Sequence, residues 1–327
     1  MYEKVVARNS PELKQESLIN SGNSLCDWAE LLPPAEGLSL LEQADLRYTA
    51  ALSTSQDDVE LLTNLGDCKV KRAEYEMEIG NSLSNPQTWV RAKELFGSAM
   101  AAYGHAYSLA DASVGDDVAG LLQNWGAGLS SLAVHTLDPE EALLAHEQAM
   151  EKLRNAAKLR PTDSSIFIAI GEACCAHVDR VQVAVSLKLL ATAIEEGFGT
   201  ALRIDSACLD SVLGRAEAHL AAGRINASAG MDFDAQNHHN LSLNYYLNAL
   251  QILKADTRNG CKLKFEEQCN VLYNIACVAA LCNKESIAAE ALTLLVQVGG
   301  LSPSDLADDS DFQNLRPKEW FVSLQKH

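Results

Sequence analysis

Apolar residues recur at steps of three and four along nearly every long segment of this chain. In residues 142–159, for example, one such series consists of Leu143, Leu144, Ala149, Met150, Leu153, Ala156 and Ala157. This spacing places the side chains on one stripe of an α-helix, whereas a strand would alternate apolar and polar positions. Long alternating stretches are absent from the sequence, and clusters of β-branched residues are few. The pattern predicts an all-α fold.

Short sequence marks repeat along the predicted helices. A first mark ends in glycine or alanine and lies at residues 19–22, 63–66, 123–126, 168–171, 211–214 and 273–276. Between first marks lies a second one, with a small residue, a bulky residue four positions later and usually an alanine three positions after that. Its instances are Ala44/Tyr48/Ala51, Ala99/Tyr103/Ala106, Ala149/Leu153/Ala156, Ser186/Leu190/Ala193, Ser242/Tyr246/Ala249 and Ala288/Leu292/Leu295. These marks predict pairs of helices that repeat along the chain.

The two marks together resemble the signature of the tetratricopeptide repeat (TPR), a helix–turn–helix unit. In that family fifteen positions separate the last small residue of one repeat from the next glycine. This chain keeps that spacing from Ala51 to Gly66 and from Ala156 to Gly171, and Pro161 falls at the family's inter-repeat proline. The resemblance implies an α-solenoid, a right-handed superhelix of about five to six helical hairpins with a C-terminal cap. Each hairpin would then cover the apolar face of its neighbour.

The repeats also predict the boundaries of the chain's parts. We expect residues 1–14 to be the tail of an incomplete N-terminal repeat, residues 15–300 to form the repeat domain and residues 301–327 to form the cap. Residues 2–7 resemble the end of a second helix without its partner, which favours a longer parent protein. In the cap, the last apolar face would be covered by Phe312, Leu315, Trp320 and Phe321.

Polar stretches that contain proline or glycine predict the connections between helices. Residues 31–37 and 135–141 each predict a helix stop, a loop and a new helix start, with Asp138 as the N-cap of the second. Residues 81–86 and 230–240 are interpreted as long loops, because the second of them is too polar for a helix core. Such loops serve either as passive excursions or as supplementary partner contacts, and the sequence leaves both open.

Charge and cysteine content narrow the class of protein. The 327 residues include 26 basic and 44 acidic side chains, a formal net charge of −18. Such a surface repels phosphate and no basic patch offsets it, so we predict no binding of nucleic acid. The sequence contains no run of eighteen apolar residues, so we predict no direct insertion into a membrane. The nine cysteines, an odd number without a CxxC pair, predict free thiols in a soluble protein of a reducing intracellular compartment, either the cytoplasm or an organelle interior.

Catalytic signatures are missing from the sequence. It contains no glycine-rich phosphate loop, GxSxG or HExxH motif. Cys174, Cys175 and His177 could form a metal corner but lack a second pair of ligands, so we interpret them as core thiols beside a partly exposed histidine. We interpret His238 and His239 as the solvated tip of the second long loop rather than as metal ligands. The sequence therefore predicts no enzyme, no metal and no cofactor.

Asparagines form the candidate binding site. One lies just before the end of four first marks, at Asn20, Asn64, Asn124 and Asn274. The TPR resemblance places this position of a first helix in the concave groove. An amide both donates and accepts hydrogen bonds, so it can hold the backbone of an extended peptide, although a solvent-exposed or inter-helix amide is the alternative. The predicted partner-binding groove consists of these four residues together with Asn23 and Asp67.

One TPR subgroup binds the C-terminal carboxylate of chaperones through two asparagines and several Lys or Arg side chains. Asn23 and Asn64 match the asparagines, but Ile19 stands at the lysine position, and Gly120 and Asn124 stand at the cationic positions of the third unit. Without these cations a carboxylate would lack the charge-assisted hydrogen bonds that hold it. The sequence therefore disfavours recognition of acidic chaperone tails.

Together, these observations predict a non-enzymatic scaffold or adaptor that binds a protein segment in its concave groove. The negative charge favours a basic or amphipathic partner, and a role as a subunit or assembly factor of a larger complex fits equally well. Two alternatives stay open. An RNA-binding helical repeat would need a basic stripe along its inner face, and an α-helical enzyme would need ionisable groups that converge in a closed pocket.

Overall fold

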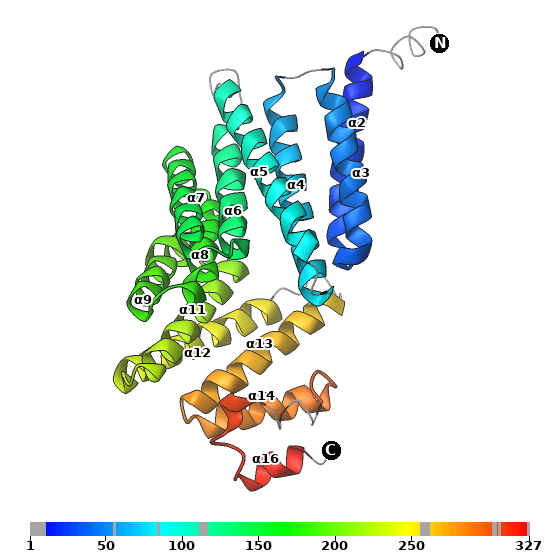
Figure 1. The fold of residues 1–327 in the computed structure, drawn as a ribbon. Coiled ribbons are helices and arrows are strands. Elements are labelled where there is room, and N and C mark those ends of the chain that lie inside the picture. Colours follow the sequence, from blue (N-terminus) through cyan, green and yellow to red (C-terminus); the bar gives the residue numbers. More distant parts are fainter. Residues whose placement is uncertain are drawn as a thin grey trace. The chain divides into compact units, whose positions relative to one another are not determined.

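The computed structural model describes residues 11–54, 57–83, 86–110, 117–255, 262–302, 306 and 309–325. Every element of regular secondary structure in these ranges is helical (Figure 1), as the hydrophobic pattern predicts. The chain forms two compact units, Met1–Thr162 (unit 1) and Asp163–His327 (unit 2).

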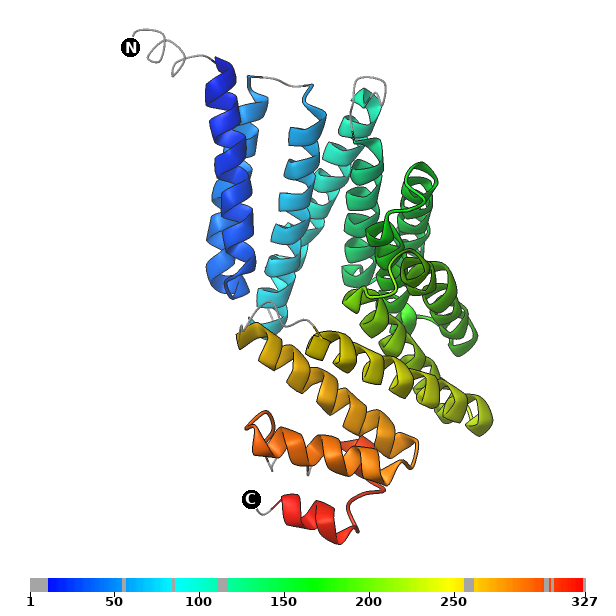
Figure 2. The same cartoon turned by 180° about the vertical axis from the view of Figure 1, so that it is seen from behind.

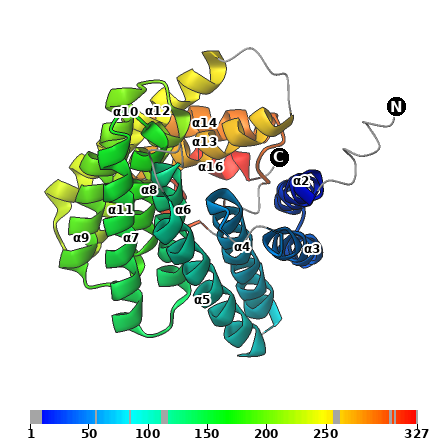
Figure 3. The same cartoon turned by 90° about the horizontal axis from the view of Figure 1, so that it is seen from above.

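Unit 1 is a stack of helical hairpins. Its described helices are α2 (Pro11–Glu30), α3 (Pro34–Leu52), α4 (Val59–Leu83), α5 (Pro86–Leu109), α6 (Val118–His135) and α7 (Pro139–Leu159). Helix α2 packs on α3, α4 on α5 and α6 on α7, while α3 contacts α4 and α5 contacts α6, so that each hairpin covers the next. Figures 1 and 2 show α2 to α5 side by side, and Figure 3 shows α4 between α3 and α5.

Local sequence signals set the starts of these helices. Pro34 stands at the start of α3, where a missing backbone N–H costs nothing. Asp58 accepts a hydrogen bond from the Leu61 backbone nitrogen at 3.0 Å, and Asp138 accepts bonds from the first turn of α7 at 2.9 Å. Capping of this kind satisfies backbone donors that have no partner inside the helix. The predicted N-cap at Asp138 is thereby confirmed.

The glycines of the first marks allow the two helices of each hairpin to approach closely. A Cβ atom on Gly22 would lie 2.5 Å from the Tyr48 ring, and one on Gly66 would lie 2.6 Å from the Tyr103 ring. Both rings are buried. The first two hairpins therefore pair as the marks predict, since the glycine leaves the space that the tyrosine ring of its own hairpin fills.

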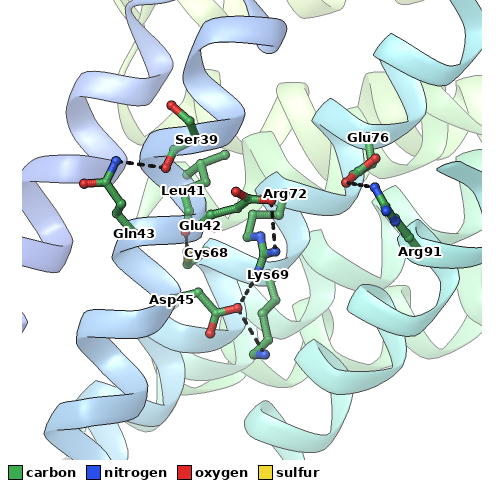
Figure 4. Close-up of polar contacts among 10 residues, drawn as sticks. All are labelled: Ser39, Leu41, Glu42, Gln43, Asp45, Cys68, Lys69, Arg72, Glu76 and Arg91. Carbon is green, nitrogen blue, oxygen red and sulfur yellow. Dashed lines mark hydrogen bonds and ion pairs between the residues drawn. The ribbon is translucent and has the colours of Figure 1, made fainter. Parts of the chain in front are cut away.

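A polar layer joins the first hairpin to the second (Figure 4). Asp45 on α3 forms ion pairs with Lys69, at 3.5 Å, and with Arg72 on α4. Arg72 also lies 3.9 Å from the Glu42 carboxylate, and the Cys68 thiol donates a hydrogen bond to the Leu41 carbonyl oxygen at 3.4 Å. Because the Asp45 side chain is largely shielded from water, these contacts help to fix the position of α4 along α3.

Unit 2 also consists of packed helices. Its described elements are α8 (Ser164–Ala176), η2 (Val178–Arg180), α9 (Val183–Thr192), η3 (Ala193–Phe198), α10 (Gly199–Ile204), α11 (Leu209–Ser228), α12 (Asp232–Ala255), α13 (Lys262–Leu281), α14 (Glu285–Gln297), η4 (Ser310–Phe312) and α16 (Glu319–Leu324). The segment η3 is a π-helix that joins α9 to α10. Helix α11 packs on α12, α12 on α13 and α13 on α14, and α16 contacts α14.

The second mark predicted for the fourth hairpin is wrong. The bulky side chain that packs against Gly171 is that of Phe198, and not that of Leu190, the bulky residue of the predicted mark. A Cβ atom on Gly171 would lie 2.7 Å from the Phe198 ring. Ile194, Phe198 and Ala201 have the spacing of the second mark, and all three are buried. The reason is an extension of the second helix through the π-helical segment η3, which carries the ring beyond the predicted position.

The two predicted long loops are largely helical. Helix α12 begins at Asp232, so most of residues 230–240 belong to it, and His239 is buried with a ring against Gly223. The prediction of a solvated histidine tip is therefore wrong. Helix α4 continues to Leu83 and α5 begins at Pro86. Of the predicted loop 81–86, residues 84 and 85 lie outside the described residues.

Buried polar residues in unit 2 include His177, which the sequence predicts to be partly exposed. It is only 2% exposed, so this prediction is also wrong. His177 directly follows the last residue of α8 and directly precedes η2.

The C-terminal residues of unit 2 pack against its last helices. Phe312, Leu315 and Phe321 are buried in one hydrophobic cluster with residues of α13 and α14. Trp320 is half-buried, and its indole nitrogen donates a hydrogen bond to Glu285 at 2.8 Å. The assignment of residues 301–327 as a cap remains a prediction that these contacts support. Residues 1–10 of the predicted N-terminal tail, residues 1–14, lie outside the described residues, and residues 11–14 belong to α2.

Candidate functional site

A polar groove crosses the first helices of unit 1. It consists of two adjoining hollows, about 340 and 270 Å³ in volume, which share Glu30, Asp67 and Lys71. Helices α2, α4 and α6 supply most of its lining, and α3 and α5 contribute mainly the two tyrosines of the second marks. The polar lining residues are Asn23, Asp27, Glu30, Tyr48, Asn64, Asp67, Lys71, Glu74, Tyr103 and Asn124.

The structure brings together four of the six predicted site residues. Asn23 and Asn64 line the first hollow, Asn124 lines the second, and Asp67 lines both. The other two lie elsewhere. Asn20 is exposed on α2 and lines neither hollow, and Asn274 is half-buried on α13 in unit 2.

Tyr48 orients the first asparagine of the groove. Its hydroxyl donates a hydrogen bond to Asn23 Oδ1 at 2.8 Å, and the Asn64 amide donates to the same oxygen at 3.5 Å. Because the Tyr48 ring is wedged against Gly22, its hydroxyl has little freedom to move. Each carboxamide keeps further hydrogen-bonding capacity beyond these contacts, which a peptide backbone could use.

Asp67 occupies the equivalent position in the second hairpin. The Tyr103 hydroxyl donates to one carboxylate oxygen at 2.5 Å, and the Asn124 amide donates to the other at 2.8 Å. Burial raises the pKa of Asp67 to about 6, although both donors favour the ionised form and act in the opposite direction. Asp67 therefore titrates close to neutral pH.

One rule connects the two positions. The residue that directly follows the glycine of the first mark accepts a hydrogen bond from the tyrosine of the second mark in the same hairpin, as Asn23 does from Tyr48 and Asp67 from Tyr103. The third hairpin has Ala127 and Leu153 at these places and cannot form the bond. The TPR-like marks thus build the groove as well as the core of the first two hairpins.

The groove carries more acid than base. Asp27, Glu30, Asp67 and Glu74 line it together with one cation, Lys71. The Lys71 ammonium lies 3.5 Å from the Glu74 carboxylate, which also accepts a hydrogen bond from Ser131 at 2.8 Å. Above the pKa of Asp67 the lining is therefore negative overall, and it favours cationic groups of a ligand.

Sequence reasoning did not identify the acidic part of the lining. Asp27 and Glu30 follow Asn23 by four and seven positions, and Lys71 and Glu74 follow Asp67 by the same two steps. These steps return to the same face of a helix. A search for polar residues one and two helical turns after Asn23 and Asp67 would have identified all four of these lining residues.

The titration of Asp67 gives a prediction about pH and stability. An ordinary aspartate in the unfolded chain has a pKa near 3.9, so between about pH 4 and pH 6 the folded state holds this proton more tightly. The folded state therefore loses stability from this group as the pH rises through that window. In Asp67→Asn the neutral side chain removes this loss, so we expect the variant to exceed the wild type by about 1–3 kcal/mol in free energy of unfolding at pH 7.5 and to match it near pH 4.

Urea unfolding at both pH values measures this difference. The control is Asp27→Asn, which neutralises an exposed aspartate of the same groove and should change the free energy of unfolding by less than about 0.5 kcal/mol at either pH. If Asp67→Asn exceeded the wild type in free energy of unfolding by the same amount at pH 4 and at pH 7.5, this result would contradict the elevated pKa of Asp67.

Outside the groove, one cluster in the described part of the chain has the residue types of a metal site. Ligand atoms of Cys277, Asp309 and Asp311 lie within 4.8 Å of one another in unit 2. Asp311 forms an ion pair with Arg224 at 2.5 Å, and Asp309 accepts hydrogen bonds from Tyr273 and Cys277. These partners account for the cluster as a structural contact between η4 and the core of unit 2.

Comparisons with known proteins identify the fold. No protein-family model and no curated protein matches the chain. Among solved structures it is similar to PilF of Pseudomonas aeruginosa, with a TM-score of 0.50 and 15% identity over 94% of this chain and 99% of that one. YrrB, a TPR protein with an unusual peptide-binding site, matches 70% of this chain and 90% of its own length, with a TM-score of 0.34 and 16% identity.

The C-terminal part of a TPR repeat-containing protein from Cytophaga hutchinsonii matches 91% of this chain and 98% of its own length, with a TM-score of 0.31 and 11% identity. The fold of this chain is TPR-like, as its sequence marks predict. None of the described helices combines the length and the apolar character that a bilayer span requires.

Proposed function

We propose that this protein is a non-enzymatic interaction scaffold that holds an extended protein segment in the groove of unit 1. The observation that carries the proposal is the row of oriented polar groups on the first helices. Asn23 and Asp67 are anchored by tyrosines, and Asn64 and Asn124 are hydrogen-bonded to them. A row of amides and a carboxylate suits the repeating donors and acceptors of an extended backbone.

The partner in this proposal is basic or amphipathic. Four acidic side chains and one lysine line the groove, and the whole chain carries a net charge of −18. A lysine or arginine of the bound segment would form charge-assisted hydrogen bonds with these carboxylates. An acidic segment would be repelled.

We further propose that the scaffold works as a subunit or assembly factor of a larger complex in a reducing intracellular compartment. The eight cysteines that the structure describes carry free thiols. Helical repeats present a large surface for their mass, which suits simultaneous contact with several partners.

The test compares the partners that the wild type and the double variant Asn64→Ala/Asn124→Ala capture in an affinity pull-down read by mass spectrometry. The matched control is Asn244→Ala/Asn248→Ala, which removes two exposed amides from α12 in unit 2. A partner bound in the groove should be lost from the first variant and retained by the control.

Synthetic segments of each such partner then give affinities by fluorescence anisotropy. Removing two backbone-directed amides should weaken binding by about 5- to 150-fold, because each hydrogen bond contributes about 0.5–1.5 kcal/mol. Raising the salt concentration should weaken it further, since the groove attracts cationic residues. Unchanged partners and affinities in the groove variant would refute the proposal.

A further inference from the structure

An apolar pocket of about 340 Å³ lies between the second and third hairpins of unit 1, and it shares no lining residue with the polar groove. Its lining comes from the end of α4, the start of α5, the end of α6 and the connection from α6 to α7. Met77, Ala92 and Phe96 line it and are buried members of one hydrophobic cluster, so the floor of the pocket is part of the core. Its volume lies within the range of about 300–1,000 Å³ that ligand pockets occupy.

Aromatic rings shape the interior of this pocket. Trp89 and Phe96 line it from α5, and His135 lines it as the last residue of α6. The His135 ring stacks on Phe96, with the ring centroids 5.9 Å apart and an interplanar angle of 29°. Flat walls of this kind suit an aromatic guest, because stacked and edge-on ring contacts stabilise it beyond the apolar area that it buries.

His135 also supplies one directed polar group. Its Nδ1 atom lies 2.9 Å from the Ser131 carbonyl oxygen, which can only accept, so the neutral ring carries its proton on Nδ1. The Nε2 atom is then a hydrogen-bond acceptor, and within the described part of the chain no group donates to it. A guest with an N–H or O–H on its aromatic ring can complete this hydrogen bond.

The rim of the pocket is apolar on two sides and acidic on a third. Val90 and Leu137 are 61% and 73% exposed, so a molecule confined to the pocket leaves much of their apolar surface in water. The charged rim groups are Lys93, Asp138 and Glu141, and the exposed Lys93 and Glu141 form an ion pair at 3.2 Å. Two carboxylates and one ammonium leave the rim negative, which favours a cationic partner.

We propose that this pocket receives one tryptophan or tyrosine side chain of a partner protein, from a segment with lysine or arginine beside that residue. The ring lies against Trp89 and Phe96, and its indole N–H or phenol O–H donates to His135 Nε2. The neighbouring cations pair with the carboxylates of the rim, and the flanking backbone covers the exposed apolar side chains. An aromatic side chain in a pocket, surrounded by contacts that exclude water, is the usual centre of binding energy in protein interfaces. This site goes beyond the proposed function, because it adds a second contact surface that reads a side chain.

The test uses a blocked pentapeptide in which tryptophan has a lysine on each side and glycines at both ends. The peptide is titrated with the full chain, and the broadening of its indole proton signals is followed by NMR. We expect saturable binding with a dissociation constant on the order of 1 mM or lower, which suits one anchoring ring. A peptide with glutamates in place of the lysines should bind more weakly, because the rim is negative.

A thermodynamic cycle isolates the hydrogen bond to His135. A peptide with 1-methyltryptophan keeps the ring but lacks the donor, so it should bind the wild type about 2- to 13-fold more weakly, the effect of one hydrogen bond. His135→Phe keeps a ring beside Phe96 but lacks the acceptor. This variant should bind both peptides with the same affinity, and circular dichroism checks its fold.

The rim provides a variant that leaves the core intact. Leu137→Ala truncates a largely exposed side chain and should weaken binding of the tryptophan peptide by about 2- to 10-fold, since less apolar surface is covered. The matched control, Leu31→Ala, truncates a leucine of unit 1 that is 81% exposed and lies outside the pocket, so it should leave the affinity unchanged.

The double variant Asn64→Ala/Asn124→Ala separates this site from the groove. Neither asparagine lines the pocket, so the variant should bind the tryptophan peptide as the wild type does. Loss of binding in this variant would place the peptide in the groove and overturn the proposal. Absence of saturable binding, or equal effects of Leu137→Ala and Leu31→Ala, would also overturn it. None of these results changes the pull-down test of the groove, so the two proposals fail separately.

Discussion

Replacing Phe198 with alanine is expected to destabilise unit 2 by about 3–5 kcal/mol. The ring is only 3% exposed, and it packs against Gly171 on α8 as well as Gly214 on α11. Its removal leaves a cavity whose walls include the backbones of two helices. Because backbone cannot relax into the space as a flexible side chain would, the full cost of the cavity should be retained.

Hydrogen exchange read by mass spectrometry measures this loss helix by helix. Protection in α8, α10 and α11 should fall, while the helices of unit 1 keep theirs. The matched control is Phe233→Ala, which removes an identical ring from α12 that is 86% exposed, and it should change stability by less than about 0.5 kcal/mol. If both variants lost the same protection, Phe198 would not be the wedge of the fourth hairpin.

Phe198 also shows where the sequence pattern stops being informative. Leu190 and Phe198 are both apolar and both buried, so hydrophobic spacing alone cannot tell which of them meets Gly171. Distance from the glycine is the better signal. In the first and third hairpins the small residue of the second mark follows the glycine by 22 and 23 positions, and Ile194 follows Gly171 by 23. The π-helix is a local change of winding that no hydrophobic pattern reveals.

The start of α12 escaped prediction for a different reason. The positions that it buries are Ala235, His239 and Ser242, whose spacing is helical but whose side chains are mostly polar. Ser242 is accommodated because its hydroxyl donates a hydrogen bond to the Ala216 carbonyl oxygen at 2.8 Å. Hydrophobic periodicity cannot detect a helix that buries polar residues, since their partners lie on another helix.

The groove was predictable in part. The structure places Asn23, Asn64 and Asn124 along the polar groove of unit 1, because the marks fix which face of a helix each residue occupies. The marks did not identify the tyrosine contacts, which depend on how far each ring reaches across its hairpin. Asn274 follows the same sequence rule but lies on α13 in unit 2, so the rule alone does not define one continuous site.

The substitution Gly66→Ala should destabilise unit 1, whereas the same change at Gly97 should stabilise it. Both glycines lie inside helices, where alanine is intrinsically favoured by about 1 kcal/mol. At Gly97 a Cβ atom meets nothing within 4 Å, so this gain should appear almost in full. At Gly66 the new atom would lie 2.6 Å from the Tyr103 ring, which is buried and cannot move away freely.

Overpacking of this kind costs about 1–3 kcal/mol, and displacement of the ring would also strain the hydrogen bond from the Tyr103 hydroxyl to Asp67. We therefore expect a net loss of up to about 2 kcal/mol for Gly66→Ala, after the helix-propensity gain is subtracted. Urea unfolding of the two variants beside the wild type compares them directly. Because the substitution is chemically identical, opposite signs can arise only from what surrounds each glycine. Stabilisation by both variants would show that the Gly66–Tyr103 contact does not hold the second hairpin closed.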